Sequence, residues 1–400
     1  MKNDLHFMRL ALTLARRGYG TTSPNPMVGA VLVKKGEIIG RGWHRRAGMP
    51  HAEIEALRAA QNGRENPRGA TLYVTLEPCS THGRTPACTD AIIAAGIRKA
   101  VIGATDPNPE HAGRAFELLR RAGIEVAHGI LADDCAQLNE AFDHWIVHRM
   151  PFVTVKAAMT LDGKIATANG ESKWITGEKA RAIGMKLRQG ADAVLVGINT
   201  VLADNPSLTF RPGSSGTSKA KKKTKPLRRI ILDTMARTPL DANVVGDEFA
   251  GLTTIVVSPA APKNRVSALG KRVKVLIAPL EPRDAGRSNV RLHSALRIPH
   301  SAFRIRFDLP WLMKRLGSEN VTHLLVEGGG ETNALFLFNR IAQRVVFFYA
   351  PRILGGMTAR KAVAGDGVTS LSEAIQLQDP EWKKIGEDLM MTARVSQKMD

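Results

Sequence analysis

Residues 75–90 read TLEPCSTHGRTPACTD, and they follow a strand-like run, residues 71–75, that stops at a Glu-Pro dipeptide. The stretch contains Cys79 and Cys88, two of the three cysteines in the chain. A short polar loop with a histidine, a glycine, an arginine and a proline separates them. The pair could form a disulfide, remain as free thiols or bind a metal, so its surroundings must decide.

A second motif, PHAEIEAL (50–57), supplies the missing partner. It places His51 at the start of a predicted helix and Glu53 two residues later. His51, Cys79 and Cys88 make three zinc ligands, and a zinc ion with three protein ligands keeps a position open for water. Glu53 is then free to act as a general acid and base. The pattern follows the H-x-E…P-C-x-x-C signature of zinc deaminases, except that eight residues separate the cysteines.

The wider spacing is compatible with metal binding if the loop returns to the N-terminus of a helix. Thiolates are stabilised there by the positive end of the helix dipole. The alternative is two buried structural cysteines and an unrelated histidine. A structural zinc would need a fourth ligand, and Cys135 fits poorly because it lies on an apolar helical face. We therefore predict a catalytic zinc site.

The length and composition of the chain limit the number of domains and the cellular locations that we expect. A chain of 400 residues is too long for one ordinary core, so we expect two domains. No apolar run is long enough for a membrane span, and the first residues lack the apolar core of a secretory signal. We therefore expect a cytoplasmic protein without disulfides.

The formal net charge of +20 favours anionic partners. Part of it lies in one lysine cluster, which consists of Lys219, Lys221, Lys222, Lys223 and Lys225. The simplest interpretation of this cluster is a solvated surface loop. Sequence-independent attraction to nucleic-acid phosphates is the alternative.

Alternating strand and helix patterns predict two α/β domains, residues 1–149 and 150–400, which meet at Met150-Pro151. In the first domain the patterns predict a hairpin in 28–43, strands at 71–76, 99–105 and 124–131, and helices at 5–17, 51–60, 88–95, 112–123 and 135–150. In the second they predict a helix at 178–190 and strands at 151–159, 192–197, 228–234, 252–258, 273–278, 323–329 and 344–350. Residues 279–308 show little periodicity, and we expect a long connection there.

PNPMVGAVLVKKGEIIGRGWH (24–44), PHAEIEAL and TLEPCSTHGRTPACTDAII (75–93) resemble the cytidine deaminase superfamily. With the second half of the chain, they resemble the bifunctional deaminase/reductases of riboflavin biosynthesis. The resemblance implies a cytidine-deaminase-like αβα layer domain followed by a dihydrofolate-reductase-like α/β domain. It also implies deamination of 2,5-diamino-6-ribosylamino-4(3H)-pyrimidinone 5′-phosphate, followed by reduction of the ribosyl side chain with NADPH to give 5-amino-6-ribitylaminouracil 5′-phosphate.

For the first domain, the resemblance implies attack by a zinc-activated hydroxide on the pyrimidine carbon that bears the amine, with Glu53 moving the protons. It implies a substrate pocket formed by Asn25, His44, His82 and Arg84. Arg84 could bind the ribose phosphate through two hydrogen bonds. The alternatives are that Asn25 only shapes a turn between prolines and that the histidines are ordinary surface residues.

In the second domain, VEGGGETNAL (326–335) reads as a strand, a glycine-rich turn and a helix. Such a turn lets backbone N–H groups approach a phosphate at a helix N-terminus. It is not the dinucleotide fingerprint G-x-G-x-x-G. VKAAMTLDGKIATANGESKWIT (155–176) and NTVLADNPSLTFR (199–211) resemble the reductase half of the family.

By this resemblance, the residues that line the cofactor are Ala158, Trp174, Thr200, Asp204, Thr234, Gly329, Gly330, Glu331, Thr332, Asn333, Ala334 and Leu335. Those that face the reductase substrate are Lys156, Ser172, Arg188, Leu208, Arg211 and Glu327. Lys156, Asp204 and Glu327 are the polar side chains that we expect nearest the chemistry. Each also has an interpretation without a role in the reaction: Lys156 as a lysine at a strand end, Asp204 as a turn-forming aspartate, and Glu327 as a surface carboxylate.

A competing hypothesis is a zinc deaminase that acts on tRNA or another nucleic acid, with a non-catalytic C-terminal domain. The net charge suits it. It would normally have a single deaminase domain and two residues between the cysteines, and it leaves the second half of the chain unexplained. We therefore expect a phosphorylated pyrimidine as the small-molecule partner, zinc and NADPH as cofactors, and no nucleic acid or membrane. A homo-oligomer remains open.

Overall fold

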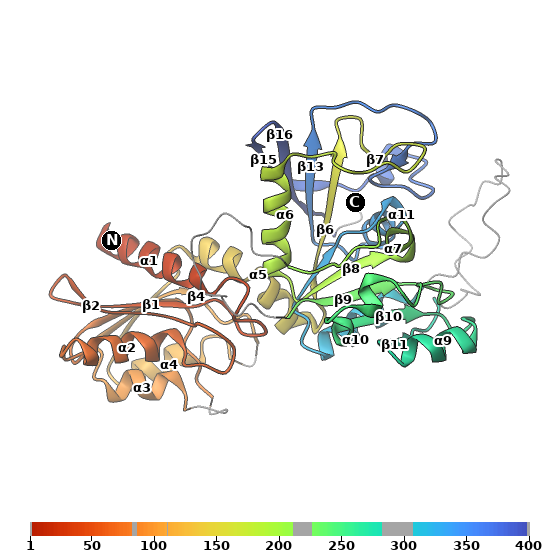
Figure 1. Cartoon of the computed structure of the whole chain (residues 1–400). Coiled ribbons are helices and arrows are strands. Elements are labelled where there is room, and N and C mark those ends of the chain that lie inside the picture. Colours follow the sequence, from red (N-terminus) through yellow and green to blue (C-terminus); the bar gives the residue numbers. More distant parts are fainter. Residues whose placement is uncertain (1, 82–85, 110, 211–225, 282–306, 398–400) are drawn as a thin grey trace. The chain divides into compact units, whose positions relative to one another are not determined.

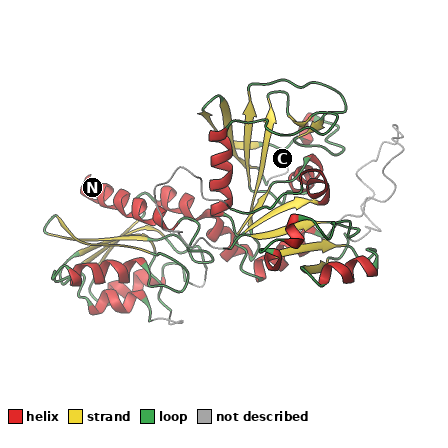
Figure 2. Cartoon of the chain, in the orientation of Figure 1, coloured by secondary structure: helices red, strands yellow, loops and turns green. Residues whose placement is uncertain are grey.

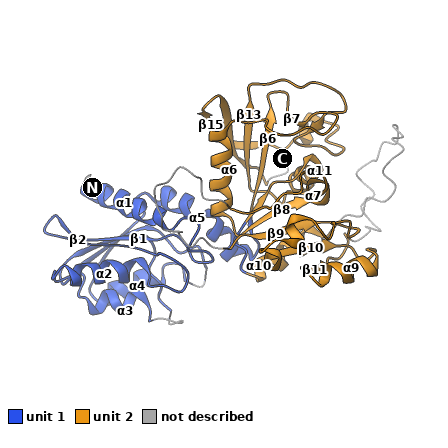
Figure 3. Cartoon of the chain, in the orientation of Figure 1, with its two compact units in different colours: residues 1–152, 220–225, 320–323 blue, residues 153–219, 226–319, 324–400 orange. Residues whose placement is uncertain are grey.

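The computed structural model describes residues 2–81, 86–109, 111–210, 226–281 and 307–397. The chain forms two compact units, shown in Figure 3. The first unit contains the described residues up to Phe152 together with Asn320–His323, and the second contains the remainder. The units thus divide after Phe152, whereas the boundary after residue 149 stays a prediction from the sequence.

The first unit is built on a five-stranded sheet of order β2-β1-β3-β4-β5 (Figure 1). The hairpin strand β1 runs antiparallel to β2 and β3, whereas β3, β4 and β5 are parallel. The strands are β1 (Gly29–Lys34), β2 (Glu37–Trp43), β3 (Thr71–Leu76), β4 (Lys99–Ala104) and β5 (Glu125–His128). The helices are α1 (Lys2–Ala15), η1 (Arg16–Gly18), α2 (Ala52–Asn62), α3 (Cys88–Ala94), α4 (Arg114–Arg121) and α5 (Ala132–His148).

Side-chain alternation along the strands makes this unit a three-layer αβα structure. Successive residues of a strand point to opposite faces of the sheet. In β1, Val31 and Val33 pack in one core with residues of α1, while Ala30 and Leu32 pack in another with residues of α2. Each face of the sheet is therefore covered by helices.

Glycines in β2 bring helix α2 unusually close to the sheet. A Cβ atom at Gly42 would lie 2.2 Å from the carbonyl oxygen of Ala52, and one at Gly40 would lie 2.3 Å from that of Ala56. Any larger residue would push the helix away. This close packing fixes the first turn of α2, which carries the predicted site residue Glu53 and directly follows His51.

The second unit contains a nine-stranded sheet of order β11-β10-β9-β8-β12-β6-β13-β16-β15. Figure 2 shows the strands of the chain in yellow and its helices in red. Its strands are β6 (Phe152–Thr160), β8 (Ala193–Gly197), β9 (Arg228–Leu232), β10 (Thr253–Val257), β11 (Lys274–Ile277), β12 (His323–Val326), β13 (Arg344–Ala350), β15 (Leu377–Ile385) and β16 (Asp388–Val395). A separate pair joins β7 (Lys164–Ala166) to β14 (Arg360–Lys361).

The helices of the second unit follow several of these strands. They are α6 (Glu178–Gly190), α7 (Ile198–Asp204), α8 (Asn243–Gly246), η2 (Ala250–Leu252), α9 (Lys263–Gly270), α10 (Leu309–Ser318), α11 (Gly330–Phe338) and η3 (Leu371–Glu373). Strands β11, β10, β9, β8 and β12 are parallel, while β16 is antiparallel to both of its neighbours. The parallel part places the carboxyl ends of its strands along one edge.

All the predicted strands and helices are present, and several further elements were not predicted. These are α7 to α10, the β7–β14 pair and the C-terminal hairpin β15–β16. Most of the predicted long connection at 279–308 lies outside the described residues, as does the lysine cluster. Among the helices of the described ranges, none has both the length and the apolar character that crossing a membrane requires.

Candidate functional sites

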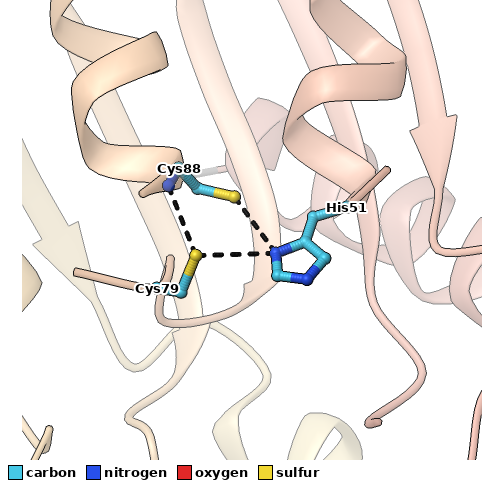
Figure 4. Close-up of side chains that lie close together, drawn as sticks. All are labelled: His51, Cys79 and Cys88. Atoms are coloured by element: carbon cyan, nitrogen blue, oxygen red, sulfur yellow. Dashed lines mark hydrogen bonds between the residues drawn. The ribbon is translucent and has the colours of Figure 1, made fainter. Parts of the chain in front are cut away.

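The three predicted zinc ligands come together in the first unit (Figure 4). His51 is the residue before α2, Cys79 follows the end of β3, and Cys88 is the first residue of α3. His51 Nδ1 lies 3.2 Å from Cys88 Sγ and 3.5 Å from Cys79 Sγ. The backbone N–H of Cys88 donates to Cys79 Sγ at 3.3 Å. The separate strand and helix ends thus converge as the sequence predicts.

The chemistry of these donors fits a zinc ion. A hydrogen bond from Cys88 lowers the pKa of Cys79 to about 4, while the same bond and burial raise the pKa of Cys88. Without a metal, the two sulfur atoms therefore favour one shared proton over two thiolates. A dication would stabilise both thiolates, because a coordinating thiol is deprotonated. The potential ligand atoms all lie within 4.8 Å of one another, as one small coordination sphere requires.

Glu53 lies beside the ligands as a buried carboxyl group. It is the second residue of α2, only 3% exposed, and its Oε2 has no hydrogen-bond partner among the described residues. Burial raises its pKa. A carboxyl group that holds a proton nearer neutral pH is suited to exchange protons with a substrate.

Asn25 and His44 form a hydrogen-bonded pair next to the metal ligands. His44 is 2% exposed, and its ring meets that of His51 edge-on at 5.3 Å between centroids. Its Nδ1 lies 3.1 Å from the carbonyl oxygen of Pro50, and its Nε2 lies 3.2 Å from Asn25 Nδ2. A carbonyl only accepts and an amide NH₂ only donates, so this geometry requires neutral His44 with its proton on Nδ1. Burial also lowers the pKa of His44.

These contacts decide part of the prediction for the deaminase pocket. His44 is not an ordinary surface residue, because it is buried beside a metal ligand. Asn25 lies in the same cluster through its bond to His44. His82 and Arg84 lie outside the described residues, so their contacts with the substrate stay predictions.

Glu77 supports the zinc site but was not singled out from the sequence. Its carboxylate is buried, with Oε2 accepting from the N–H groups of Asp106 and Gly113, both at 3.0 Å. Its Oε1 accepts from the N–H of Ala115 at 2.9 Å. Glu77 thereby joins the end of β3 to the start of α4 and restrains the chain two residues before Cys79. The Glu-Pro-Cys sequence was the available signal.

Asn139 on α5 is a second supporting residue that the sequence did not reveal. Its side chain is 4% exposed and holds the backbone of Met27 at two points. The N–H of Met27 donates to Asn139 Oδ1 at 2.8 Å, and Asn139 Nδ2 donates to the Met27 carbonyl at 2.9 Å. The next carbonyl, that of Val28, accepts from the N–H of His44 at 2.9 Å. Asn139 therefore fixes the segment that carries Asn25 and contacts His44.

In the second unit, the predicted cofactor residues gather at the carboxyl ends of parallel strands. Gly197 in β8 pairs with Leu232 in β9, so these two strands end side by side. The pairing of β8 with β12 brings the end of β12 to the same edge. Thr200 follows β8 and Thr234 follows β9, and the glycine-rich turn follows β12. Open α/β sheets bind ligands in this place.

The glycine-rich turn leaves room above the start of α11. A Cβ at Gly328 would lie 2.4 Å from that of Thr332, and one at Gly330 would lie 2.2 Å from the carbonyl oxygen of Lys361. At Gly329, by contrast, the nearest atom would be Thr200 Oγ1 at 3.9 Å. The first and third glycines are therefore needed for packing, whereas the second borders open space at the helix N-terminus, where an anion is favoured. These residues fit the phosphates of a dinucleotide.

The side chains of the other cofactor candidates differ in accessibility. Trp174 is 64% exposed, and the guanidinium of Arg181 stacks 4.7 Å from its ring centroid. Asn333 is fully buried, and its amide donates to the carbonyl of Ala362 at 2.8 Å. Its side chain therefore lies in the interior and ties α11 to the segment that contains Ala362. The remaining candidates are Glu331, which is exposed, Ala158 and Leu335, which are half-buried, and Thr332 and Ala334, which are buried.

Arg188 and Glu327 form an ion pair among the predicted substrate residues. Arg188 Nε and Nη2 donate to the two carboxylate oxygens of Glu327 at 3.1 and 2.6 Å. Burial acts to raise the pKa of Glu327, but Arg188 and Lys156 outweigh it and hold the pKa below its ordinary value. The three residues thus form one charged group. Glu327 is not a surface carboxylate, since its side chain is only 10% exposed.

A second polar group contains Ser172 and Asp204. The Ser172 hydroxyl donates to Asp204 Oδ1 at 3.3 Å; Ser172 is half-buried and Asp204 is exposed. Leu208 is 3% exposed and belongs to the hydrophobic core, so a substrate contact would have to come from its backbone. Arg211 lies outside the described residues, and its role stays a prediction.

Asp162 is a polar residue after β6 that the sequence interpretation did not select. Its Oδ1 accepts from the Thr160 hydroxyl at 2.6 Å and from the N–H of Leu354 at 3.1 Å, and its Oδ2 accepts from the N–H of Gly355 at 2.7 Å. The hydrogen bond from Thr160 is the main cause that lowers its pKa to about 2. Asp162 thereby connects the turn after β6 to the loop after β13.

Comparison with known proteins gives matches in both halves of the chain. Residues 1–104 match the cytidine and deoxycytidylate deaminase zinc-binding region, and residues 151–391 match the RibD C-terminal domain. The riboflavin biosynthesis protein RibD of Aquifex aeolicus is 42% identical over 390 residues, which cover 97% of each protein.

Two solved structures are similar over nearly the whole chain. RibD of Acinetobacter baumannii is 32% identical, with a TM-score of 0.81. The diaminohydroxyphosphoribosylaminopyrimidine deaminase/5-amino-6-(5-phosphoribosylamino)uracil reductase of Thermotoga maritima is 34% identical, with a TM-score of 0.78. Each comparison covers 99% of both chains.

Proposed function

The chain belongs to the RibD family of bifunctional deaminase/reductases of riboflavin biosynthesis, and we propose that its two reactions occur at the two sites described above. The predicted fold class, a cytidine-deaminase-like domain followed by a reductase domain, is confirmed. Zinc and NADPH are its cofactors. The observation that carries the assignment of the first site is the convergence of His51, Cys79 and Cys88 beside buried Glu53.

At the first site, His51, Cys79 and Cys88 hold the zinc. When bound, zinc lowers the pKa of a water molecule in its open position towards neutrality. Glu53 would carry two protons in turn: one from the attacking water to the pyrimidine ring nitrogen, and a second from the hydroxyl group added at the carbon to the amine, which then leaves as ammonia. Its burial beside the ligands supports this role because the carboxyl group can hold a proton between transfers.

The substrate of this reaction is 2,5-diamino-6-ribosylamino-4(3H)-pyrimidinone 5′-phosphate. Asn25, His44 and His82 line the substrate pocket, while Arg84 binds the ribose phosphate. The position of His44 against His51 supports the first assignment. The charge and geometry of an arginine suit the second.

At the second site, the turn from Gly329 and the N-terminus of α11 bind the cofactor phosphates. Bound NADPH supplies the hydride. The other cofactor contacts come from Ala158, Trp174, Thr200, Asp204, Thr234 and the residues of α11 up to Leu335. Lys156, Arg188 and Glu327 hold the ribosyl side chain of the deaminated product, together with Ser172, Leu208 and Arg211. The charged group formed by Lys156, Arg188 and Glu327 supports this placement.

We also propose that residues 1–149 form the deaminase domain, residues 150–400 the reductase domain, and that the protein works in the cytoplasm. Each proposed site is built from one chain, so a homo-oligomer is compatible with the proposal and is not required by it.

Incubation of the purified protein with the diaminopyrimidine phosphate, followed by mass analysis, tests this function. Without NADPH, the expected product has a carbonyl oxygen in place of the amine. With NADPH, that product also gains two hydrogens. An unchanged substrate in both reactions, together with deamination of an RNA oligonucleotide, would instead support the nucleic-acid deaminase.

A further inference from the structure

The turn after β9 presents a cation beside the proposed cofactor site. Arg237 is exposed, and among the described residues its guanidinium makes one hydrogen bond, from Nη2 to Asn199 Oδ1 at 3.0 Å. Asn199 is the neighbour of Thr200, and Thr234 lies three residues before Arg237. The guanidinium is thus joined to α7 at the edge where β8 and β9 end.

Side-chain hydrogen bonds fix the backbone of the turn that carries Arg237. Asp233 Oδ2 accepts from both the N–H and the hydroxyl of Thr238 at 2.7 Å. Arg265, from α9, donates to the carbonyl oxygens of Ala236 at 3.0 Å and Thr238 at 2.6 Å. The backbone on both sides of Arg237 is therefore fixed before any ligand binds, which reduces the entropy cost of binding.

The charges at this strand end favour a phosphate over a hydroxyl. In Rossmann-type dinucleotide sites, a carboxylate near a strand end accepts a ribose hydroxyl of NADH, whereas an arginine accommodates the 2′-phosphate of NADPH. Here the carboxylate of Asp233 is fully buried and already bonded to Thr238. The group left at the surface is the guanidinium of Arg237, which can bind a phosphate through two parallel N–H groups.

We propose that Arg237 binds the 2′-phosphate of NADPH and makes the reductase select NADPH over NADH. The inference rests on the proposed cofactor site at the ends of β8, β9 and β12. It adds a specificity-determining residue outside the set that the sequence selected. Asn199 acts as its positioning residue by holding one side of the guanidinium.

Binding of NADPH and NADH to full-length zinc-loaded protein, measured by calorimetry without substrate, tests the proposal. Arg237→Gln keeps a hydrogen-bonding side chain but removes the charge. It is expected to weaken NADPH binding by about tenfold to a hundredfold, the range for a charge-assisted hydrogen bond. NADH binding should stay within about twofold, since it lacks the phosphate. Arg237→Lys should retain part of the preference for NADPH over NADH. Lysine keeps the positive charge but lacks the two parallel N–H donors of the guanidinium.

Arg272→Gln is the matched control. Arg272 is also exposed and also makes one hydrogen bond, to the carbonyl of Leu240 at 2.7 Å, but it precedes β11 and so lies at the amino end of the strands. The Arg272→Gln substitution should change the affinity for neither NADPH nor NADH.

Three results would overturn the proposal in different ways. Equal weakening of both dinucleotides by Arg237→Gln would place the arginine on the shared pyrophosphate. If the wild type binds NADPH and Arg237→Gln binds both dinucleotides with the same affinities as the wild type, Arg237 is not part of the cofactor site. The proposed function would then stand unchanged. A wild type that binds neither dinucleotide would contradict the cofactor site itself, and Arg237 with it.

Discussion

The guanidinium of Arg188 and the carboxylate of Glu327 make a two-point ion pair, at 3.1 and 2.6 Å, in a largely buried position. Arg188 belongs to α6, whereas Glu327 follows β12. The pair joins these distant segments, and Arg188 Nη1 also donates to the carbonyl of Thr209 at 3.1 Å. One contact therefore supports both the fold of the second unit and the proposed substrate site.

Glu327→Ala should reduce stability as well as reduction of the substrate. It leaves the charge of Arg188 buried without its partner, a change that typically costs about 3–5 kcal/mol. Urea unfolding of the full chain measures the loss. The double variant Arg188→Met/Glu327→Met should regain most of the stability, because no charge stays unpaired, and should still fail to reduce the substrate. A stable Glu327→Ala protein with normal reduction would show that the pair is dispensable.

The same carboxylate predicts a pH dependence of stability. Burial acts to raise the pKa of Glu327, but Arg188 and Lys156 hold it below the ordinary value of 4.5. Because the folded-state pKa is the lower one, the stabilisation is present above the unfolded pKa and is lost as the pH falls through the folded pKa. Wild type and the double variant should therefore differ in acid sensitivity. Parallel unfolding curves for the two proteins from neutral pH down to about 3 would contradict this expectation.

Zinc content should depend on Cys88 and not on Cys135. Cys88→Ala removes one of the three ligands, so elemental analysis should find little bound zinc. Cys135→Ala is the control, since Cys135 is also buried but lies in a hydrophobic core away from the ligand group. Equal zinc content in the two variants would exclude Cys88 as a ligand.

Asn139→Ala should impair deamination without removing zinc. It leaves the partly buried N–H and carbonyl of Met27 without their partner, at a cost of about 1–3 kcal/mol. The segment that carries Asn25 would then move, and the KM of deamination should rise more than kcat falls. The exposed Gln137 on the same helix provides the control, Gln137→Ala. A lower kcat with unchanged KM would argue against positioning of the substrate pocket.

The zinc site could be predicted because its chemistry depends on residue types at strand and helix ends. His51, Cys79 and Cys88 have few other reasons to occur in that arrangement. Glu77 and Asn139 could not be found in this way, since they act by pairing with backbone groups that are distant in sequence. The identity of a glutamate or an asparagine does not indicate which distant backbone groups it will bind.

The second unit shows a similar limit. The pattern at 326–335 predicted a glycine-rich turn, but not that Gly329 alone borders open space. Strand β15 was missed because nearly all its residues are exposed, which removes the apolar alternation that identifies a strand. Its pairing with β16 forms it instead.

The most direct test of the two-site account uses Glu53→Gln in the full-length protein. The amide keeps the shape of the side chain but cannot transfer protons, so deamination should fall by about 10²- to 10⁴-fold while zinc is retained. The same preparation, given the deaminated product and NADPH, should reduce it at the wild-type rate. Loss of reduction together with deamination in a folded, zinc-containing variant would contradict two separate sites and require a single shared one.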